Sequence, residues 1–239
     1  HGLKKPSERN SRISKESVVA REEKLPSGSV LRALGYIFDQ AKEPIDVVVS
    51  SFTALMLCAP ERINEVLRLR RNCLVAGEGR YQGKFGFRWA GSKGASDTTK
   101  WLPSDMVPVA KRALSNLCSV SNPAHQIAIW YTKNPKSLFL DEGLENLRSK
   151  EFLSLEEVGL ILWGIDTRTS SSLNWLKANL PSDSLKVVDG KRGYPFKEIE
   201  KAVLAKLPST FPYVPGAPNL LCKDALALLR LNETHNDKV

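Results

Sequence analysis

Apolar positions recur at helical spacing along most of the chain. Between 29 and 42, Leu31, Leu34, Ile37 and Phe38 share one helical face, and Pro44 ends that run. The same period, or a mostly apolar run, predicts further helices over 46–58, 61–70, 105–118, 123–133, 154–163, 197–207 and 221–231. Residues 141–149 and a short segment around Trp175 are weaker helix candidates.

Two segments alternate between apolar and polar residues and predict antiparallel hairpins. Phe85, Phe87 and Trp89 alternate with small or charged residues, between predicted strands at 73–75 and 100–103. A second two-stranded element over 187–196 turns at Asp189-Gly190, a common hairpin turn. The expected fold class is therefore mainly α with small antiparallel hairpins or sheets, an α+β chain.

Polar and proline-rich stretches separate the predicted elements into four parts. Residues 1–25 lack apolar periodicity and predict a flexible basic arm or linker. Residues 26–150 and 151–207 are predicted as two folded parts, the second opened by the capping-box sequence Ser154–Glu157. Residues 208–239, with four prolines up to Pro218, predict an irregular linker and a terminal helix.

Composition excludes several classes of protein. The 239 residues are 42% hydrophobic and 26% charged, which is ordinary globular usage. No run approaches the roughly 18 apolar residues of a membrane span, and the first 25 residues lack a signal-peptide core. The four cysteines lie far apart, so we expect reduced, mostly buried thiols in a cytoplasmic protein. With three scattered histidines, we expect no metal site and no cofactor.

The net charge of +9 is concentrated in two segments. Residues 1–25 carry seven basic and four acidic side chains, and residues 61–115 carry eleven basic and five acidic ones. Residues 151–207 carry eight of each. A focused basic excess favours a polyanionic partner, most simply nucleic acid, although a generally basic surface without a partner remains the alternative.

The basic block resembles the catalytic domain of tyrosine recombinases, the phage integrase family. In that family an arginine starts a helix of the form G-x-R-x-x-E-x-x-x-L. Arg62, Glu65 and Leu69 match this spacing, with Pro60 where glycine is usual. The resemblance covers about residues 26–125.

The family next has a β-hairpin that carries a catalytic lysine, followed by a strand with a basic residue. Lys93 falls at the hairpin lysine, and Lys100–Pro103 fits the strand; Lys100 is the second candidate for the catalytic lysine. The resemblance implies that Arg62 binds the scissile phosphate, that Lys93 protonates the leaving 5′-oxygen, and that Glu65 orients the arginine. We also predict DNA contacts from Arg68, Arg88 and Lys100.

The second half of the family pattern is not found. An H-x-x-R motif is absent after His1, His125 and His235, and no such motif precedes any of the five tyrosines. We therefore expect an amino-terminal fragment of the catalytic region that lacks the nucleophilic tyrosine and is inactive alone.

Residues 152–203 resemble the winged helix-turn-helix domains of excisionases and MerR-type regulators. The resemblance rests on Leu153–Leu162, a Trp175-Leu176-Lys177 helix, and a Gly190-Lys191-Arg192 wing. It implies groove contacts from the second helix and backbone contacts from the wing. The residues concerned are Arg168, Thr169, Ser170, Ser171, Asn174, Lys191 and Arg192. The zero net charge of this part leaves a protein-contact role open.

The leading interpretation is a double-stranded-DNA-binding fragment of a site-specific integrase, acting in DNA integration and recombination for a phage or mobile element. It would be cytoplasmic and nucleoid-associated when bound to DNA, with no membrane partner; self-association on DNA through the full-length protein is left open. The alternatives are a non-catalytic DNA-binding regulator and a helical protein-interaction scaffold.

Overall fold

The computed structural model describes residues 15–89, 97–188 and 191–228, which fall into two compact units divided between Lys42 and Glu43. The first unit contains α1 (Lys15–Glu22) and α2 (Gly28–Gln40). The helix α1 lies inside the segment predicted as an arm, because its Lys, Glu, Ala and Arg residues favour a helix without an apolar face. The Ser27 hydroxyl accepts from the Val30 amide at 3.4 Å and caps α2.

The second unit begins with a helical layer. The helix α3 (Pro44–Cys58) packs against α5 (Val107–Val120), which follows the 3-10 turn η2 (Ser104–Met106). Leu55 of α3 and Leu117 of α5 are fully buried. Both helices carry proline near the first position, where the missing amide costs nothing.

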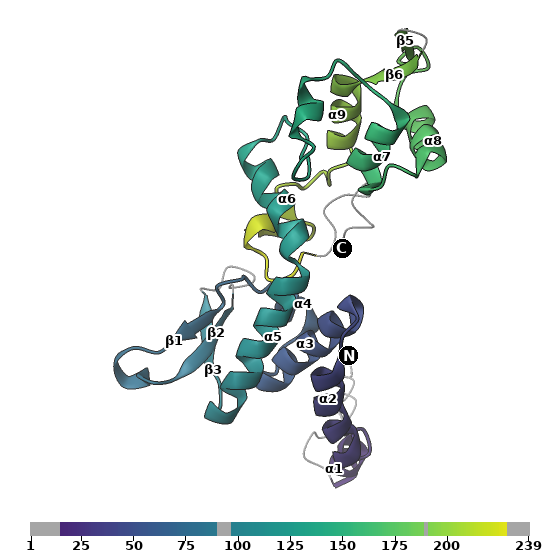
Figure 1. Ribbon diagram of the computed structural model, residues 1–239. Helices are drawn as coiled ribbons and strands as arrows, with labels where there is room; N and C mark the ends of the chain where they lie inside the picture. Colours follow the sequence, from purple (N-terminus) through teal and green to yellow (C-terminus); the bar gives the residue numbers. More distant parts are fainter. Residues whose placement is uncertain (1–14, 90–96, 189–190, 229–239) are drawn as a thin grey trace, which may run out of the picture. The chain divides into compact units, whose positions relative to one another are not determined.

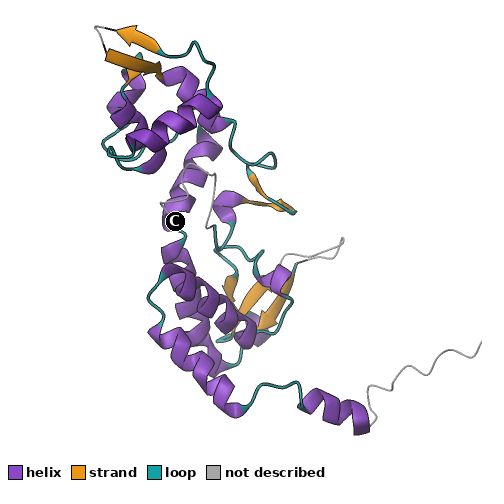
Figure 2. Ribbon diagram, turned by 90° about the vertical axis from the view of Figure 1, so that its right-hand side faces the viewer, coloured by secondary structure: helices purple, strands orange, loops and turns teal. Residues whose placement is uncertain are grey.

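A three-stranded antiparallel sheet lies beside these helices (Figure 1). Its strands, in spatial order, are β1 (Leu74–Ala76), β2 (Phe85–Trp89) and β3 (Thr98–Trp101), with the 3-10 turn η1 (Gly79–Tyr81) between the first two. The three predicted strands are confirmed, each within a residue or two of the expected bounds. Figure 2 also shows the long helices to one side of this sheet.

The helix predicted over 61–70 is much shorter in the structure. The helix α4 spans only Ile63–Val66, and tighter turns follow it, in which the Leu69 amide donates to the Val66 carbonyl at 3.1 Å. Beyond that point the backbone pairs with a distant segment: the Leu226 amide donates to the Leu69 carbonyl at 2.8 Å, and Arg70 forms a bridge with Ala225. This long-range pairing replaces the helical hydrogen bonds that the local pattern predicted.

The end of the described chain packs on α6 (Asn122–Lys133). The segment predicted as an irregular linker contains a hairpin of β7 (Tyr213–Val214) and β8 (Ala217–Leu221). The predicted terminal helix over 221–231 is wrong in the described part, where only the 3-10 turn η4 (Cys222–Asp224) forms. Cys222 and Leu228 are buried against α6, so the apolar positions that suggested a helix serve this packing instead.

The helices and the hairpin predicted between 152 and 207 are present in order, with one additional short strand before them, and we call this stretch the winged part. They are β4 (Phe152–Leu153), α7 (Leu155–Trp163), α8 (Thr169–Asn179), β5 (Lys186–Val188), β6 (Lys191–Pro195) and α9 (Phe196–Leu204). Ser154 caps α7, with its hydroxyl accepting from the Glu157 amide at 3.3 Å, as the capping box predicts. The strands form one small sheet in the order β4-β6-β5.

The apolar core of this part extends beyond the predicted boundary at residue 151. Leu138, Leu140 and Leu147, the last from the 3-10 helix η3 (Glu145–Ser149), pack with Leu162 and Ile199. The candidate helix over 141–149 is thus a short 3-10 helix in that core. The segment before β4 therefore belongs structurally with the winged elements.

The predicted fold class is confirmed: the chain is mainly helical with small antiparallel sheets. Over the ranges the structure describes, no helix is long and apolar enough to cross a membrane. The four cysteines are unpaired, and all but Cys118 are buried, as expected. Burial raises the pKa of Cys58 to about 11 and that of Cys73 to about 12, so these thiols stay protonated at neutral pH.

Candidate nucleic-acid interface

Arg62 occupies the turn between α3 and α4, where it is the residue that precedes the first helical position. Its amide donates to Glu65 Oε2 at 3.4 Å, and its Nη1 lies 3.7 Å from Glu65 Oε1. The arginine side chain is 87% exposed, whereas that of Glu65 is 33% exposed. Glu65 therefore holds the backbone of the turn, and the guanidinium keeps most of its surface open to a ligand.

Lys100 connects the sheet to this same turn. Its Nζ forms an ion pair with the Glu61 carboxylate and lies 3.4 Å from the Pro60 carbonyl oxygen. The Lys100 ammonium is the main reason why the pKa of Glu61 is lowered, which burial opposes and a contact with Glu65 assists. β3 is thus held to the two residues that precede Arg62.

The structure therefore brings together Arg62, Glu65 and Lys100, which the sequence predicted, and adds Glu61, which it did not. Glu61 lies beside Arg62, but its partner comes from a strand far along the chain. An acidic residue directly before the arginine in a strongly basic block was the only available signal. No spacing rule links it to Lys100.

Lys93 lies outside the described residues, in the 90–96 connection between β2 and β3. The flanking strands pair as predicted, with Trp89 opposite Thr98. The assignment of Lys93 as the general acid therefore stays a prediction.

The remaining residues of the basic block that we predicted to contact DNA differ in how exposed and how free of ion pairs their side chains are. Lys100 pairs with Phe87 across the sheet and so shares the buried face of β2, whereas Arg88 is on the opposite face and exposed. Arg68 is also exposed. Because Glu61 neutralises Lys100, Arg68 and Arg88 are the better placed of the three for phosphate contact.

The helix α8 presents a polar, exposed edge. Ser170, Ser171 and Asn174 are exposed on α8, and Thr169 is partly exposed. Arg168 precedes this helix, with its guanidinium carbon 6.0 Å from the centre of the Trp163 ring. Ser172 is instead buried and donates to the Arg168 carbonyl at 2.9 Å, which fixes the start of the helix.

The predicted wing is confirmed as an antiparallel hairpin. Lys186 pairs with Gly193 and Val188 with Lys191. The turn at 189–190 and the side chains of Lys191 and Arg192 lie outside the description, so their phosphate contacts stay predictions.

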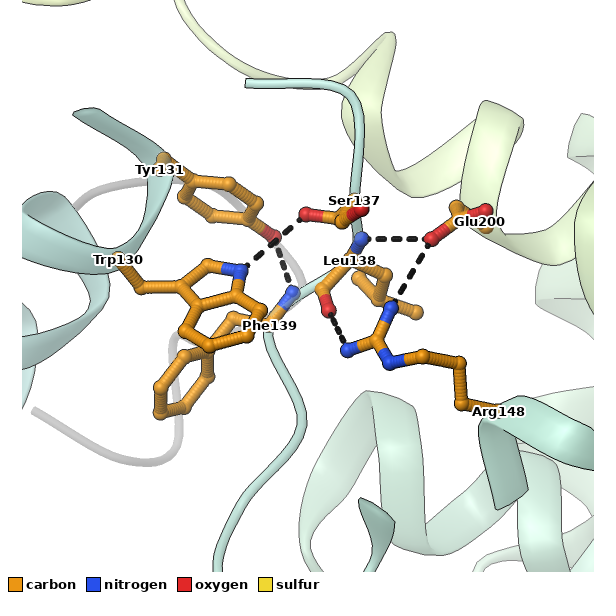
Figure 3. A network of polar contacts seen from close by, with 7 residues as sticks. All are labelled: Trp130, Tyr131, Ser137, Leu138, Phe139, Arg148 and Glu200. Carbon is orange, nitrogen blue, oxygen red and sulfur yellow. Dashed lines mark hydrogen bonds and ion pairs between the residues drawn. The ribbon is translucent and has the colours of Figure 1, made fainter. Parts of the chain in front are cut away.

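An ion-pair network ties the winged part to the segment that precedes it (Figure 3). The Glu200 carboxylate on α9 accepts from the Leu138 amide at 2.7 Å and lies 3.4 Å from Arg148 Nη1. Arg148 Nη2 donates to the Leu138 carbonyl at 2.7 Å. This part of the chain therefore folds back on itself through one shared carboxylate.

Two aromatic residues at the end of α6 continue that network. Trp130 Nε1 donates to the Ser137 carbonyl at 3.3 Å, and the Tyr131 hydroxyl accepts from the Phe139 amide at 3.3 Å (Figure 3). Tyr131 is fully buried, and burial raises its pKa to about 12. It is a structural residue, not an accessible nucleophile.

His125 is buried and has a structural partner. Its Nε2 lies 3.0 Å from the Ala225 carbonyl oxygen and donates to it, because a carbonyl oxygen can only accept. Burial is the main cause that lowers its pKa. Within the part of the chain that the structure describes, no cluster of three or more His, Cys, Asp or Glu side chains could hold a metal ion.

No protein-family model, curated protein or solved structure matches this chain.

Proposed function

We propose that the chain binds double-stranded DNA as the amino-terminal part of a tyrosine recombinase catalytic domain, in site-specific DNA integration or recombination. The observation that carries this proposal is the contact between Lys100 and Glu61. It joins the strand after the predicted catalytic hairpin to the turn that carries Arg62. In the family that the sequence resembles, the arginine motif and the lysine hairpin act on the same phosphate. Here the Lys100–Glu61 contact joins the segments that carry these two motifs.

Arg62 has the chemistry that such a site needs. A phosphodiester under attack gains negative charge on its nonbridging oxygens, and a guanidinium binds two such oxygens at once while staying charged. The side chain is 87% exposed, and Glu65 lies at the long end of ion-pair distance. A phosphate can therefore replace a weak, partly solvated contact at little cost.

In the proposed reaction, the oxygen of a deprotonated tyrosine bonds to phosphorus as the bond from phosphorus to the 5′-oxygen breaks. Lys93 would donate the proton that the leaving 5′-oxygen takes up. Glu65 would keep the Arg62 turn in place. None of these steps requires a cofactor, and none is proposed.

The winged part would add a second DNA contact through the exposed edge of α8, with Ser170, Ser171 and Asn174 facing a groove and Arg168 and Thr169 at the start of the helix. Lys191 and Arg192 of the wing would meet phosphates. A protein that acts on chromosomal DNA in this way would be cytoplasmic and nucleoid-associated.

A protein partner is the second candidate for part of the surface. Ile45 and Val49 are one turn apart on α3 and are 65% and 58% exposed. Ile63 and Leu67, around α4, are 48% and 46% exposed. Large exposed apolar side chains at helical spacing favour a protein contact, such as self-association on DNA.

The proposal is tested by the salt dependence of binding to a random-sequence DNA duplex. Because each neutralised phosphate contributes about −0.9 to the slope of log affinity against log salt, six contacts predict a slope of about −5. Fluorescence anisotropy of a labelled duplex measures it. Binding that is absent at low salt, or does not change with salt, would rule out DNA as the partner.

A further inference from the structure

The face of the β1–β2–β3 sheet that points away from the helices carries a basic and aromatic cluster. Strand alternation places Gly86, Arg88, Thr99 and Trp101 on this face. The buried Phe87 and Trp89 are on the other face. The helices α3 and α5 lie on the other side of the sheet (Figures 1 and 2), and η1 reaches this face through the Tyr81 ring.

Two aromatic rings form the base of the cluster. Tyr81 of η1 stacks on Trp101 of β3, with ring centroids 4.7 Å apart and planes 20° from parallel. Trp101 lies directly over Gly86, since a Cβ on that glycine would stand 3.0 Å from Trp101 Cε3. The absence of a side chain at this position lets the indole lie close to the sheet.

Two cations are held on this aromatic base. The guanidinium carbon of Arg80 lies 4.8 Å from the centre of the Tyr81 ring, and Lys84 Nζ lies 5.9 Å from it. Cation–π contacts restrain these side chains without neutralising their charge. Arg88, on the same sheet face, is exposed.

These charges have no acidic partner within the described ranges. No ion pair joins Arg80, Lys84 or Arg88 to a carboxylate there, although Glu78 is exposed immediately before η1. This contrasts with Lys100 on the other face, which Glu61 neutralises. We call Arg80, Lys84 and Arg88 the basic sheet face.

We propose that the basic sheet face binds the phosphate backbone of duplex DNA, as a contact separate from the Arg62 turn; this inference rests on the proposed function. All three cations are exposed, and a single exposed ion pair contributes little. Binding to a polyanion is stronger than a single ion pair. Each exposed cation that contacts a phosphate releases counterions condensed on the DNA, and these contributions to the affinity add. The Tyr81 ring is already engaged by Trp101 and two cations, which favours phosphates over stacked, unpaired bases.

The test uses the full chain and a triple variant, Arg80→Gln, Lys84→Gln and Arg88→Gln. Three lost phosphate contacts should reduce the magnitude of the salt slope for a random duplex by about 2.7. The matched control, Lys197→Gln, Lys201→Gln and Lys206→Gln, removes the same charge from exposed positions on and just after α9 and should leave the slope unchanged. Near-ultraviolet circular dichroism confirms that each variant keeps its aromatic packing.

The outcomes separate this inference from the proposed function. If the unaltered chain shows no salt-dependent binding, the proposed function fails, and this inference fails with it. If it binds and the sheet-face variant keeps the full slope, or if both triple variants lose equally, DNA binding stands and the basic sheet face is not its site. A variant that loses binding to single-stranded DNA or to RNA, but not to the duplex, overturns the assigned occupant.

Discussion

At the scale of single residues, the environment decides which basic side chains can act. Arg62 and Lys100 lie on adjoining segments and carry the same charge, yet Arg62 is 87% exposed and Lys100 is paired with Glu61. The sequence predicted both as functional, because spacing and residue type identify candidates. It could not separate them, because the Glu61 contact depends on how β3 approaches the turn after α3.

Replacing Arg62 tests its assigned role. We expect Arg62→Ala to reduce the magnitude of the salt slope for duplex binding by about 0.9, since one phosphate contact is lost. The matched variant Arg62→Lys keeps the charge and should keep the slope, although it loses bidentate binding. Thermal unfolding should not change in either variant, because the side chain is mostly solvent-exposed. A full slope in Arg62→Ala would show that this arginine does not contact DNA.

His125 makes stability depend on pH in a defined range. Burial lowers its folded pKa below the ordinary 6.5, an effect that Arg71 assists and that Asp224 and the Ala225 carbonyl oppose. At pH values between the folded and the unfolded pKa of His125, the unfolded chain binds more protons than the folded chain. The free energy of unfolding should therefore fall as the pH decreases below about 6.5.

Urea unfolding at pH 7.5 and pH 5.5 measures this effect. His125→Gln retains a donor for the Ala225 carbonyl and cannot titrate, so it should lose less stability between these two values than the unaltered chain. An equal loss in both proteins would show that His125 is not the titrating group.

At the scale of elements, local signals predicted most of the structure. The Ser154 capping box, the strand pairs and the wing all formed where turn and capping residues agree with the apolar period. The predicted helix bounds were wrong where contacts between distant segments replace local helical hydrogen bonds. The helix α4 ends early because Leu69 and Arg70 pair with residues 225–226. The expected helix after 221 gave way to that same pairing. The spacing of apolar residues along the chain cannot predict a contact between segments so far apart in sequence.

The close packing of α7 against the turn that follows it predicts a sensitive position at Gly159. A Cβ there would stand 2.8 Å from the Ile165 carbonyl oxygen, so Gly159→Ala should force α7 away from the following turn and cost about 1–3 kcal/mol. Gly35→Ala in α2 is the matched control, since nothing lies within 4 Å of its Cβ, and it should stabilise its helix by about 0.5–1 kcal/mol. Thermal unfolding by far-ultraviolet circular dichroism compares the two. A Gly159→Ala variant as stable as the unaltered chain would contradict the close approach.

At the scale of the whole molecule, the structure shows on which surfaces the basic residues lie. The basic block of residues 61–115 includes both the Arg62 turn and the basic sheet face. The winged part is neutral overall and exposes mainly hydroxyl and amide groups on α8. We therefore expect residues 61–115 to supply most of the salt-dependent affinity for DNA, and α8 to contribute contacts that depend less on salt.

Hydrogen–deuterium exchange of the full chain, with and without a duplex at low salt, tests whether the Arg62 turn and the β2–β3 hairpin beside it face DNA. We expect slower amide exchange in residues 60–69 and in β2 and β3 when DNA is bound, with α9 unchanged. A duplex that binds without slowing exchange in either the turn or the two strands would contradict it.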